Sequence, residues 1–229
     1  MNSVPILYEN DEIYVINKPQ GLAVQGGQGI AHSLDNDFGK QVGQKVFLVH
    51  RLDKDTSGLM IVAKTSFAAG KWTKLIGSKS VKKEYIAICA GSLKEKSGVI
   101  NDTVIQHGEK KSALTHYKVE KEWIEEFHED KEDNNSPIIQ TIKMSKIRLV
   151  LETGRMHQIR IHLAKNNCPI AGDDSHGAFK LNKLLKKYLK IKRLQLSSVK
   201  LTVPGLREDG KDSVFELSEE DIRNTLYIR

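Results

Sequence analysis

The residues best suited to chemistry lie in one short stretch, 50–59. It contains a carboxylate, Asp53, two residues after the guanidinium of Arg51. The Thr-Ser-Gly at 56–58 is typical of a turn, because hydroxyls bond the local backbone and glycine tolerates positive φ. The apolar run 59–63 then predicts a buried strand, so we expect Asp53 on a loop held by rigid elements. An oriented, ionised aspartate can act as nucleophile or general base, and a merely solvated turn is the alternative.

A second candidate group follows a predicted strand at 152–162, which reads Glu-Thr-Gly-Arg-Met-His-Gln-Ile-Arg-Ile-His. Arg155 lies near the start of a predicted helix, and Arg160 follows about one and a half turns later. A helix N-terminus with arginines favours phosphate or carboxylate. His157 and His162 are five residues apart and share a helical face poorly, so we expect no metal site and ordinary hydrogen bonding in the core.

A third candidate is Tyr85, in the segment Lys-Lys-Glu-Tyr-Ile-Ala at 82–87. The segment is predicted to be a strand on which alternate residues face a core. An aromatic ring there could stack on a nucleic acid base, and a half-buried tyrosine with its hydroxyl in water is the alternative.

These segments together resemble the RluA-type pseudouridine synthases. The chain fills every fixed position of the pattern His-Arg-Leu-Asp-x-x-Thr-Ser-Gly-Leu, and of the pattern Thr-Gly-Arg-x-His-Gln-Ile-Arg. The resemblance implies that Asp53 is the catalytic carboxylate, that Arg155 pairs with it, and that Tyr85 stacks on the target uracil. It also implies that Arg51 fills the space left by a uridine flipped out of its stack.

The resemblance extends from residue 9 to residue 174, and the Gly-Gly at 26–27 is most similar to the RluC-type enzymes of large-subunit ribosomal RNA. We therefore expect an isomerase that converts specific uridines of that RNA, the 23S RNA, to pseudouridine. Isomerisation needs neither redox change nor hydrolysis, so no cofactor is implied. His50, Lys18, Lys54 and Arg160 are expected RNA contacts, together with Arg51.

Three alternatives stay open at this stage: an RNA-binding protein without activity, a synthase acting on tRNA, and a hydrolase that uses Asp53 and Asp55 as a carboxylate pair. The chain also departs from the family pattern at three positions. Met156 stands where threonine is common, His176 where tyrosine usually precedes glycine, and Ser197 where histidine is frequent. These changes remove no catalytic group and affect expected contacts at the edge of the substrate.

Composition agrees with an RNA partner. The 229 residues carry a formal net charge of +7. Seven basic residues and no acid lie in 179–193, where leucines at helical spacing predict a helix with a lysine face, whereas 120–133 holds eight acids and two lysines. A solvated surface is the alternative for both runs. We find no apolar window of membrane-spanning length and no disulfide pattern for Cys89 and Cys168, so we expect a cytoplasmic monomer.

The predicted fold is an α+β pseudouridine synthase domain, with a mixed, mostly antiparallel sheet flanked by helices around a central RNA-binding cleft. Strands are predicted at 13–17, 47–49, 59–63, 83–90, 114–119, 145–151 and 194–203, and helices at 66–76, 157–165, 181–189 and 219–227. We expect residues 1–229 to form a single catalytic domain, without the small N-terminal RNA-binding domain of many relatives, and 129–137 to be a polar loop insertion.

Overall fold

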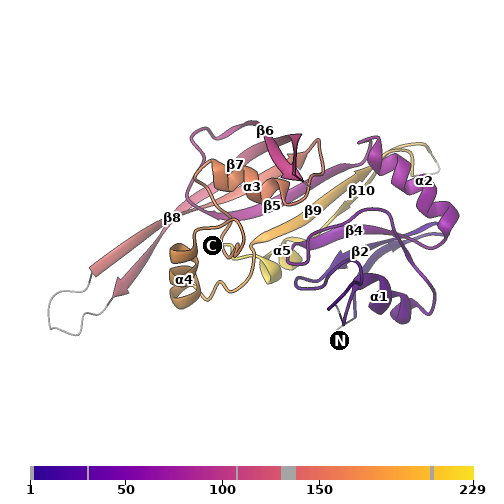
Figure 1. The fold of residues 1–229 in the computed structure, drawn as a ribbon, viewed down its shortest axis with the longest axis horizontal. Coiled ribbons are helices and arrows are strands. Elements are labelled where there is room, and N and C mark those ends of the chain that lie inside the picture. Colours follow the sequence, from indigo (N-terminus) through magenta and orange to yellow (C-terminus); the bar gives the residue numbers. More distant parts are fainter. Residues whose placement is uncertain (1–2, 30, 107, 130–137, 207–208) are drawn as a thin grey trace.

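The computed structural model describes residues 3–29, 31–106, 108–129, 138–206 and 209–229 (Figure 1). The strands in these ranges are β1 (Ile6–Glu9), β2 (Ile13–Lys18), β3 (Phe47–Leu48), β4 (Ser57–Ala63), β5 (Lys82–Ala90), β6 (Ser97–Gln106), β7 (Glu109–Glu129), β8 (Ile138–Leu151), β9 (Leu196–Val203) and β10 (Ser213–Glu216). The helices are α1 (Leu34–Val42), α2 (Ser66–Gly77), α3 (Gln158–Lys165), α4 (Phe179–Tyr188) and α5 (Glu219–Thr225).

The strands form one sheet in the order β1-β2-β4-β9-β5-β8-β7-β6, with β10 pairing to β9 and β3 to β4. Among the described residues the pairings are antiparallel, except that β4 runs parallel to β9 through Ser57 and Gly58. The join between β4 and β9 is therefore short, and it lies directly after the loop that carries Asp53. The predicted α+β class with a mostly antiparallel sheet is confirmed.

Both faces of the sheet are buried, and alternate residues of a strand enter separate cores. On β5, Tyr85 and Ala87 pack in the core that also contains residues of α1 and α3. Ile86 and Ile88 pack in the opposite core, with residues of α2, α4 and α5. Asp53 follows Leu52, which belongs to the first core, so the candidate site lies on the face that α3 covers.

A long hairpin of β7 and β8 extends beyond the sheet (Figure 1). Its described part is fastened to the rest of the molecule. Phe127 stacks on Tyr188 of α4, with ring centroids 4.9 Å apart. Glu125 is buried and accepts hydrogen bonds from the Tyr227 hydroxyl (2.9 Å) and from Trp123 Nε1 (2.7 Å). The hairpin base therefore packs against α4 and the segment after α5.

The predicted elements are present, and several are longer or additional. The strand expected at 114–119 is the middle of β7, while β1, β6, β10 and α1 lack a counterpart in the prediction. The predicted loop insertion at 129–137 begins at the end of β7, and its residues 130–137 lie outside the described ranges. Within the part of the chain that the structure describes, no helix has the length and apolar character needed to span a membrane.

Candidate active site

Asp53 lies on a braced turn immediately before β4. The amide of Thr56 donates to the Asp53 carbonyl (3.1 Å) and closes the turn. Lys18 and Gln20 hold it from the side, because Lys18 Nζ donates to the Lys54 carbonyl (3.0 Å) and Gln20 Nε2 to the Asp55 carbonyl (2.7 Å). The Asp53 side chain itself is 20% exposed. The predicted loop between rigid elements is thus observed, with a carboxylate that solvent or a ligand can reach.

Gly58 allows β9 to approach this turn. Its φ is +107°, a value that favours glycine, and an added Cβ would lie 2.1 Å from the Ser198 carbonyl oxygen. Ser57 and Gly58 pair with Ser197 and Ser198 across this contact. The Thr-Ser-Gly segment therefore fixes the β4–β9 join as well as the turn.

Two cationic or ionisable groups face the Asp53 carboxylate. Arg160 Nη1 lies 3.7 Å from Asp53 Oδ2, and His157 Nε2 lies 3.8 Å from the same oxygen. The pairing expected for Arg155 is wrong in this structure: Arg155 is exposed, and its Nε donates to the Ser112 carbonyl (3.3 Å). Arg155 precedes α3 on a turn directed toward β7, whereas Arg160 lies on the buried side of the helix and extends toward Asp53.

Arg160 is in turn fixed by Asp173. Arg160 Nε and Nη2 donate to the two Asp173 oxygens at 2.8 and 2.6 Å, and both side chains are buried. Burial opposes the charge of each group, yet the mutual hydrogen bonds raise the pKa of Arg160 and, with amides of His176 and Ser175, lower the pKa of Asp173. An ion pair that satisfies its donors in this way can hold a buried guanidinium in one orientation. Arg160 therefore lies too deep to be the RNA contact we expected, and it orients Asp53.

His157 contacts Asp53 and a second histidine. It adopts a left-handed backbone, with φ +54°, at the residue before α3, and its Nδ1 lies 2.9 Å from His176 Nε2. Only one of these two nitrogens can carry the proton between them, because two N–H groups would repel each other at this distance. Burial and the charges of Arg160 and His157 lower the pKa of His176, although Asp173 and Asp53 oppose this. His176 is thus a neutral partner that orients the His157 ring toward Asp53.

Tyr85 lies in β5 on the same face of the sheet. Its side chain is buried in the core below the site. Burial raises the pKa of its phenol, and the negative charge of Asp53 raises it further, so the hydroxyl stays protonated at neutral pH. A neutral aromatic ring next to a carboxylate is a suitable wall for a planar base.

The remaining expected RNA contacts divide into exposed and buried side chains. Arg51 and Lys54 are exposed and available to a ligand. Lys18 is completely buried, and its Nζ donates to the Pro19, Leu22 and Lys54 carbonyls at 2.9, 2.8 and 3.0 Å. The three donors of Lys18 are used, so in this structure the side chain braces the Asp53 turn and offers no donor to a ligand.

His50 is also a structural residue and not an exposed RNA contact. Its Nε2 accepts a hydrogen bond from the Ile61 amide (3.0 Å), which requires the neutral ring. Burial and the nearby charge of Lys83 lower the pKa of His50 to about 3. The ring therefore links the start of the Asp53 turn to β4.

The assembled site offers a partly exposed carboxylate, an arginine locked beside it, a histidine pair and a buried aromatic ring. Within the described ranges no three His, Cys, Asp or Glu residues are grouped as metal ligands would be. Such an arrangement suits nucleophilic or general-base chemistry by Asp53 on a planar substrate.

Comparison with known proteins identifies the family. Residues 12–165 match the family model described as RNA pseudouridylate synthase, which is more than half of the chain. The chain belongs to the RNA pseudouridylate synthase family. Asp53, Tyr85, Arg160 and His157 lie within the matched residues, and Asp173 lies just beyond them.

Individual relatives agree with this family. The chain is 34% identical over 188 residues to ribosomal large subunit pseudouridine synthase D of Haemophilus influenzae, covering 75% of this chain and 52% of the relative. It is 33% identical over 211 residues to ribosomal large subunit pseudouridine synthase C of Rickettsia prowazekii, covering 86% and 63%. The chain thus spans between half and two thirds of the length of these relatives. The solved structure of human RNA pseudouridylate synthase domain containing 4 has the same fold, with a TM-score of 0.70 at 24% identity, over 97% of this chain and 92% of that one.

The sequence did not reveal the structural roles of Asp173, His176 and Gln158. Gln158 Oε1 accepts from the Arg155 amide (3.0 Å), and its Nε2 donates to the Leu114 carbonyl (3.0 Å), which fastens the turn before α3 to β7. Asp173 lies within the stretch that the resemblance covers, and His176 was noted only as a departure from the family pattern. Nothing else in the sequence marks Asp173 as the partner of Arg160.

Proposed function

We propose that this protein is an RNA pseudouridine synthase, and that Asp53 is its catalytic carboxylate. The observation that carries the proposal is the Asp53 carboxylate, partly exposed on a braced turn with Arg160 at 3.7 Å, in a chain that belongs to the pseudouridylate synthase family. Arg160 and His157 counter the negative charge of Asp53 and orient it, as a carboxylate nucleophile or base requires.

The chemistry is an isomerisation. The bond from the ribose to N1 of uracil breaks, a bond from the ribose to C5 forms, the C5 proton leaves and N1 gains a proton. Atoms and electrons therefore balance without an oxidant, a reductant or water. The target uridine leaves its stack to reach Asp53, with Tyr85 as the surface beneath the uracil ring. Arg51 is exposed next to the turn and can occupy the position that the uridine leaves.

The proposed substrate is large-subunit ribosomal RNA, because the curated relatives carry that substrate in their names. We propose that the exposed Arg51, Lys54 and Arg155 contact its phosphates, since all three lie around the Asp53 turn or the turn before α3. We further propose that residues 1–229 act as one catalytic domain, as a monomer and in the cytoplasm.

The proposal can be tested by tritium release from RNA labelled at C5 of uridine. Release should occur from large-subunit ribosomal RNA transcripts and leave the chain length of the RNA unchanged. Release from tRNA alone would contradict the ribosomal assignment. Tight binding without release would indicate an inactive RNA-binding protein, and shortened RNA would indicate a hydrolase.

A further inference from the structure

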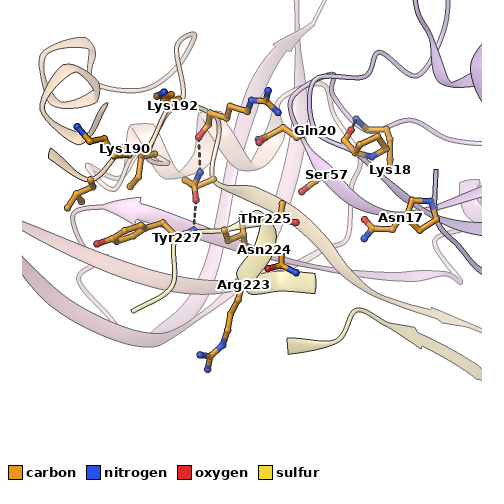
Figure 2. Close-up of a pocket in the computed structure, with 17 residues that line it drawn as sticks. Asn17, Lys18, Gln20, Ser57, Lys190, Lys192, Arg223, Asn224, Thr225 and Tyr227 are labelled. Atoms are coloured by element: carbon orange, nitrogen blue, oxygen red, sulfur yellow. Dashed lines mark hydrogen bonds between the residues drawn. The ribbon is translucent and has the colours of Figure 1, made fainter. Parts of the chain in front are cut away.

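A cavity lies beside the turn that carries Asp53, with Lys18, Gln20 and Ser57 among its lining residues. It has a volume of about 600 Å³, within the range of roughly 300–1,000 Å³ that is usual for small-ligand sites. Its wall combines the end of β2, the segment from α4 to β9, and α5 with the residues after it (Figure 2). Apart from Lys18, which braces the Asp53 turn, the proposed mechanism uses none of its cations.

The charged residues that line this cavity are all basic. Its lining residues include Lys18, Lys190, Lys192, Arg193 and Arg223, and no Asp or Glu is among the described ones. Lys190 Nζ donates to the Lys187 carbonyl (2.9 Å), and Arg223 Nε lies 4.0 Å from Glu219 Oε2. Lys192 and Arg193 are exposed and form no ion pair with a described residue. A concave surface lined by cations concentrates positive electrostatic potential and attracts phosphate groups.

The cavity also offers groups that can recognise a base by hydrogen bonding and stacking. The side-chain amides of Asn17 and Asn224 have no hydrogen-bond partner in the described residues, and each supplies both donors and an acceptor. The Tyr227 ring lines the same space (Figure 2). Proteins commonly bind single-stranded RNA with cations, free amides and an aromatic ring, because the bases stack on aromatic rings and form hydrogen bonds with side chains.

The wall is fixed in advance by hydrogen bonds. Gln195 Nε2 donates to the Arg193 carbonyl (2.9 Å), and Gln195 Oε1 accepts from the Tyr227 amide (2.6 Å). The Tyr227 hydroxyl is held by buried Glu125 (2.9 Å). A site whose groups are already oriented binds with less loss of side-chain entropy than a mobile one.

The cavity is joined to the active site through shared backbone contacts. Gln20 Nε2 donates both to the Asp55 carbonyl of the catalytic turn and to the Leu194 carbonyl of the cavity wall. Gly172, next to the Asp173 that holds Arg160, packs directly against the Arg193 backbone, where an added Cβ would lie 2.2 Å from the Arg193 carbonyl oxygen. The turn that carries Asp53 and the wall of the cavity are therefore connected through Gln20 and through Gly172.

We propose that this cavity is a nucleotide subsite for the single-stranded RNA that flanks the target uridine. Lys192 and Arg193 bind its phosphates, and Asn224 and Asn17 bind the edge of one base. The proposal rests on the proposed function for the identity of the ligand as RNA. It adds that recognition extends to this cavity, beyond the pocket of the modified base.

The test compares binding of a fluorescent uridine pentanucleotide to the parent chain and to Lys192→Gln/Arg193→Gln. The matched control is Lys74→Gln/Lys82→Gln, which removes the same charge from exposed lysines on α2 and β5. We expect the cavity variant to bind about tenfold more weakly, and its log–log salt slope to fall by about 1.4, from two contacts at about 0.7 each on a single strand. The control should bind like the parent.

A variant without charge change separates base recognition from phosphate attraction. Asn224→Leu should weaken pentanucleotide binding about two- to tenfold, the effect of one hydrogen bond, and leave the salt slope unchanged. Tritium release at saturating RNA should keep the parental rate constant in all three variants, while the concentration for half-saturation rises for the two cavity variants.

Three results would overturn the subsite. In the first, both cavity variants bind the pentanucleotide with the parental affinity. In the second, the cavity and control double variants lose the same amount of affinity. In the third, uridine 5′-monophosphate binds as tightly as the pentanucleotide, and its affinity falls equally in the cavity variants. The last result would indicate a free-nucleotide site. Because the readout is binding, a chain that shows these losses but no tritium release would contradict the proposed function and leave the RNA subsite standing.

Discussion

At the scale of single residues, the site depends on which side chains are free to bind a ligand and which are already engaged in hydrogen bonds within the protein. Arg160 and Lys18 carry charge, but their donors are committed to Asp173 and to backbone carbonyls. Arg51 and Arg155 remain exposed. The motif residues therefore divide into a buried set that shapes the Asp53 turn and an exposed set that can meet RNA.

Tyr85 tests the role of the ring against that of the hydroxyl. We predict that Tyr85→Phe loses less single-turnover activity than Tyr85→Leu, because a base stacked on an aromatic ring gains about 1–3 kcal/mol. The measurement is tritium release at saturating RNA, with thermal unfolding as a control, since the ring is buried. Equal and nearly complete loss in both variants would assign a proton-transfer role to the hydroxyl.

His50 makes stability depend on pH. Its folded pKa of about 3 lies below the ordinary value of 6.5, so the unfolded chain binds a proton that the folded chain does not. This contribution to stability is present above pH 6.5 and is lost as the pH falls toward 3, by up to about 1.4 kcal/mol per pH unit. We predict that His50→Gln, whose amide oxygen can accept from the Ile61 amide, loses less stability between pH 7 and 4.5. Parallel curves of unfolding free energy against pH for parent and variant would contradict this.

At the scale of elements, the anchoring of the β7–β8 hairpin offers a sharp test. Glu125 is buried and accepts from Trp123 Nε1, the Tyr227 hydroxyl and Arg229 Nη1. We predict that Glu125→Ala lowers the free energy of unfolding by about 1–3 kcal/mol, because partly buried donors lose their acceptor. The neighbouring exposed Glu126→Ala should stay within about 0.5 kcal/mol of the parent in denaturant unfolding. Equal effects of the two substitutions would show that Glu125 anchors nothing.

The sequence predicted those elements whose own pattern is strong. The apolar run after the Asp53 turn and the leucine stripe of α4 were found because periodicity alone marks them. β6 contains Asn101 and Asp102, which disfavour strands, and the outer half of β7 is rich in acids. Those strands form because cross-strand pairing overrides weak local preference, and a single sequence does not show that pairing.

The absence of tertiary contacts from a single sequence also explains the errors in the predicted site. Asp53 and Tyr85 could be named from their own segments, whereas the partner of Asp53 depends on how α3 packs against the turn. Arg155 and Arg160 are both plausible by spacing, and only their burial separates them. Lys18 and His50 were expected to contact RNA because their charge was visible and the carbonyl and amide that bind them were not.

At the scale of the whole molecule, one basic run follows the chain from α4 toward β9. The helix α4 presents lysines around a single buried leucine, Leu185, and the basic cavity wall continues directly from its end. The acids of 120–129 lie on the hairpin instead. The basic run suits contact with a polyanion.

Replacing Lys183, Lys186, Lys187 and Lys190 by Ala tests the α4 face. We predict weaker RNA binding across all sequences and a log–log salt dependence that is shallower by about two, because roughly two to three of the four lysines can face one strand. Turnover at saturating RNA should hardly change, since these residues act on encounter. Unchanged affinity with parallel salt slopes would show that this face is only solvated.

The central claim is that Asp53 performs the isomerisation, and Asp53→Asn tests it most directly. The amide keeps the shape of the carboxylate but is neither nucleophilic nor basic, and Asp55→Asn makes the same change two residues away on the exposed side of the turn. The measurement is single-turnover tritium release from large-subunit ribosomal RNA at saturating enzyme, with RNA affinity and thermal unfolding recorded in parallel. We predict that Asp53→Asn binds RNA and unfolds like the parent yet loses at least about 10²–10⁴-fold in rate, while Asp55→Asn stays close to the parental rate. Substantial release by Asp53→Asn, or equal loss in both variants, would contradict the account.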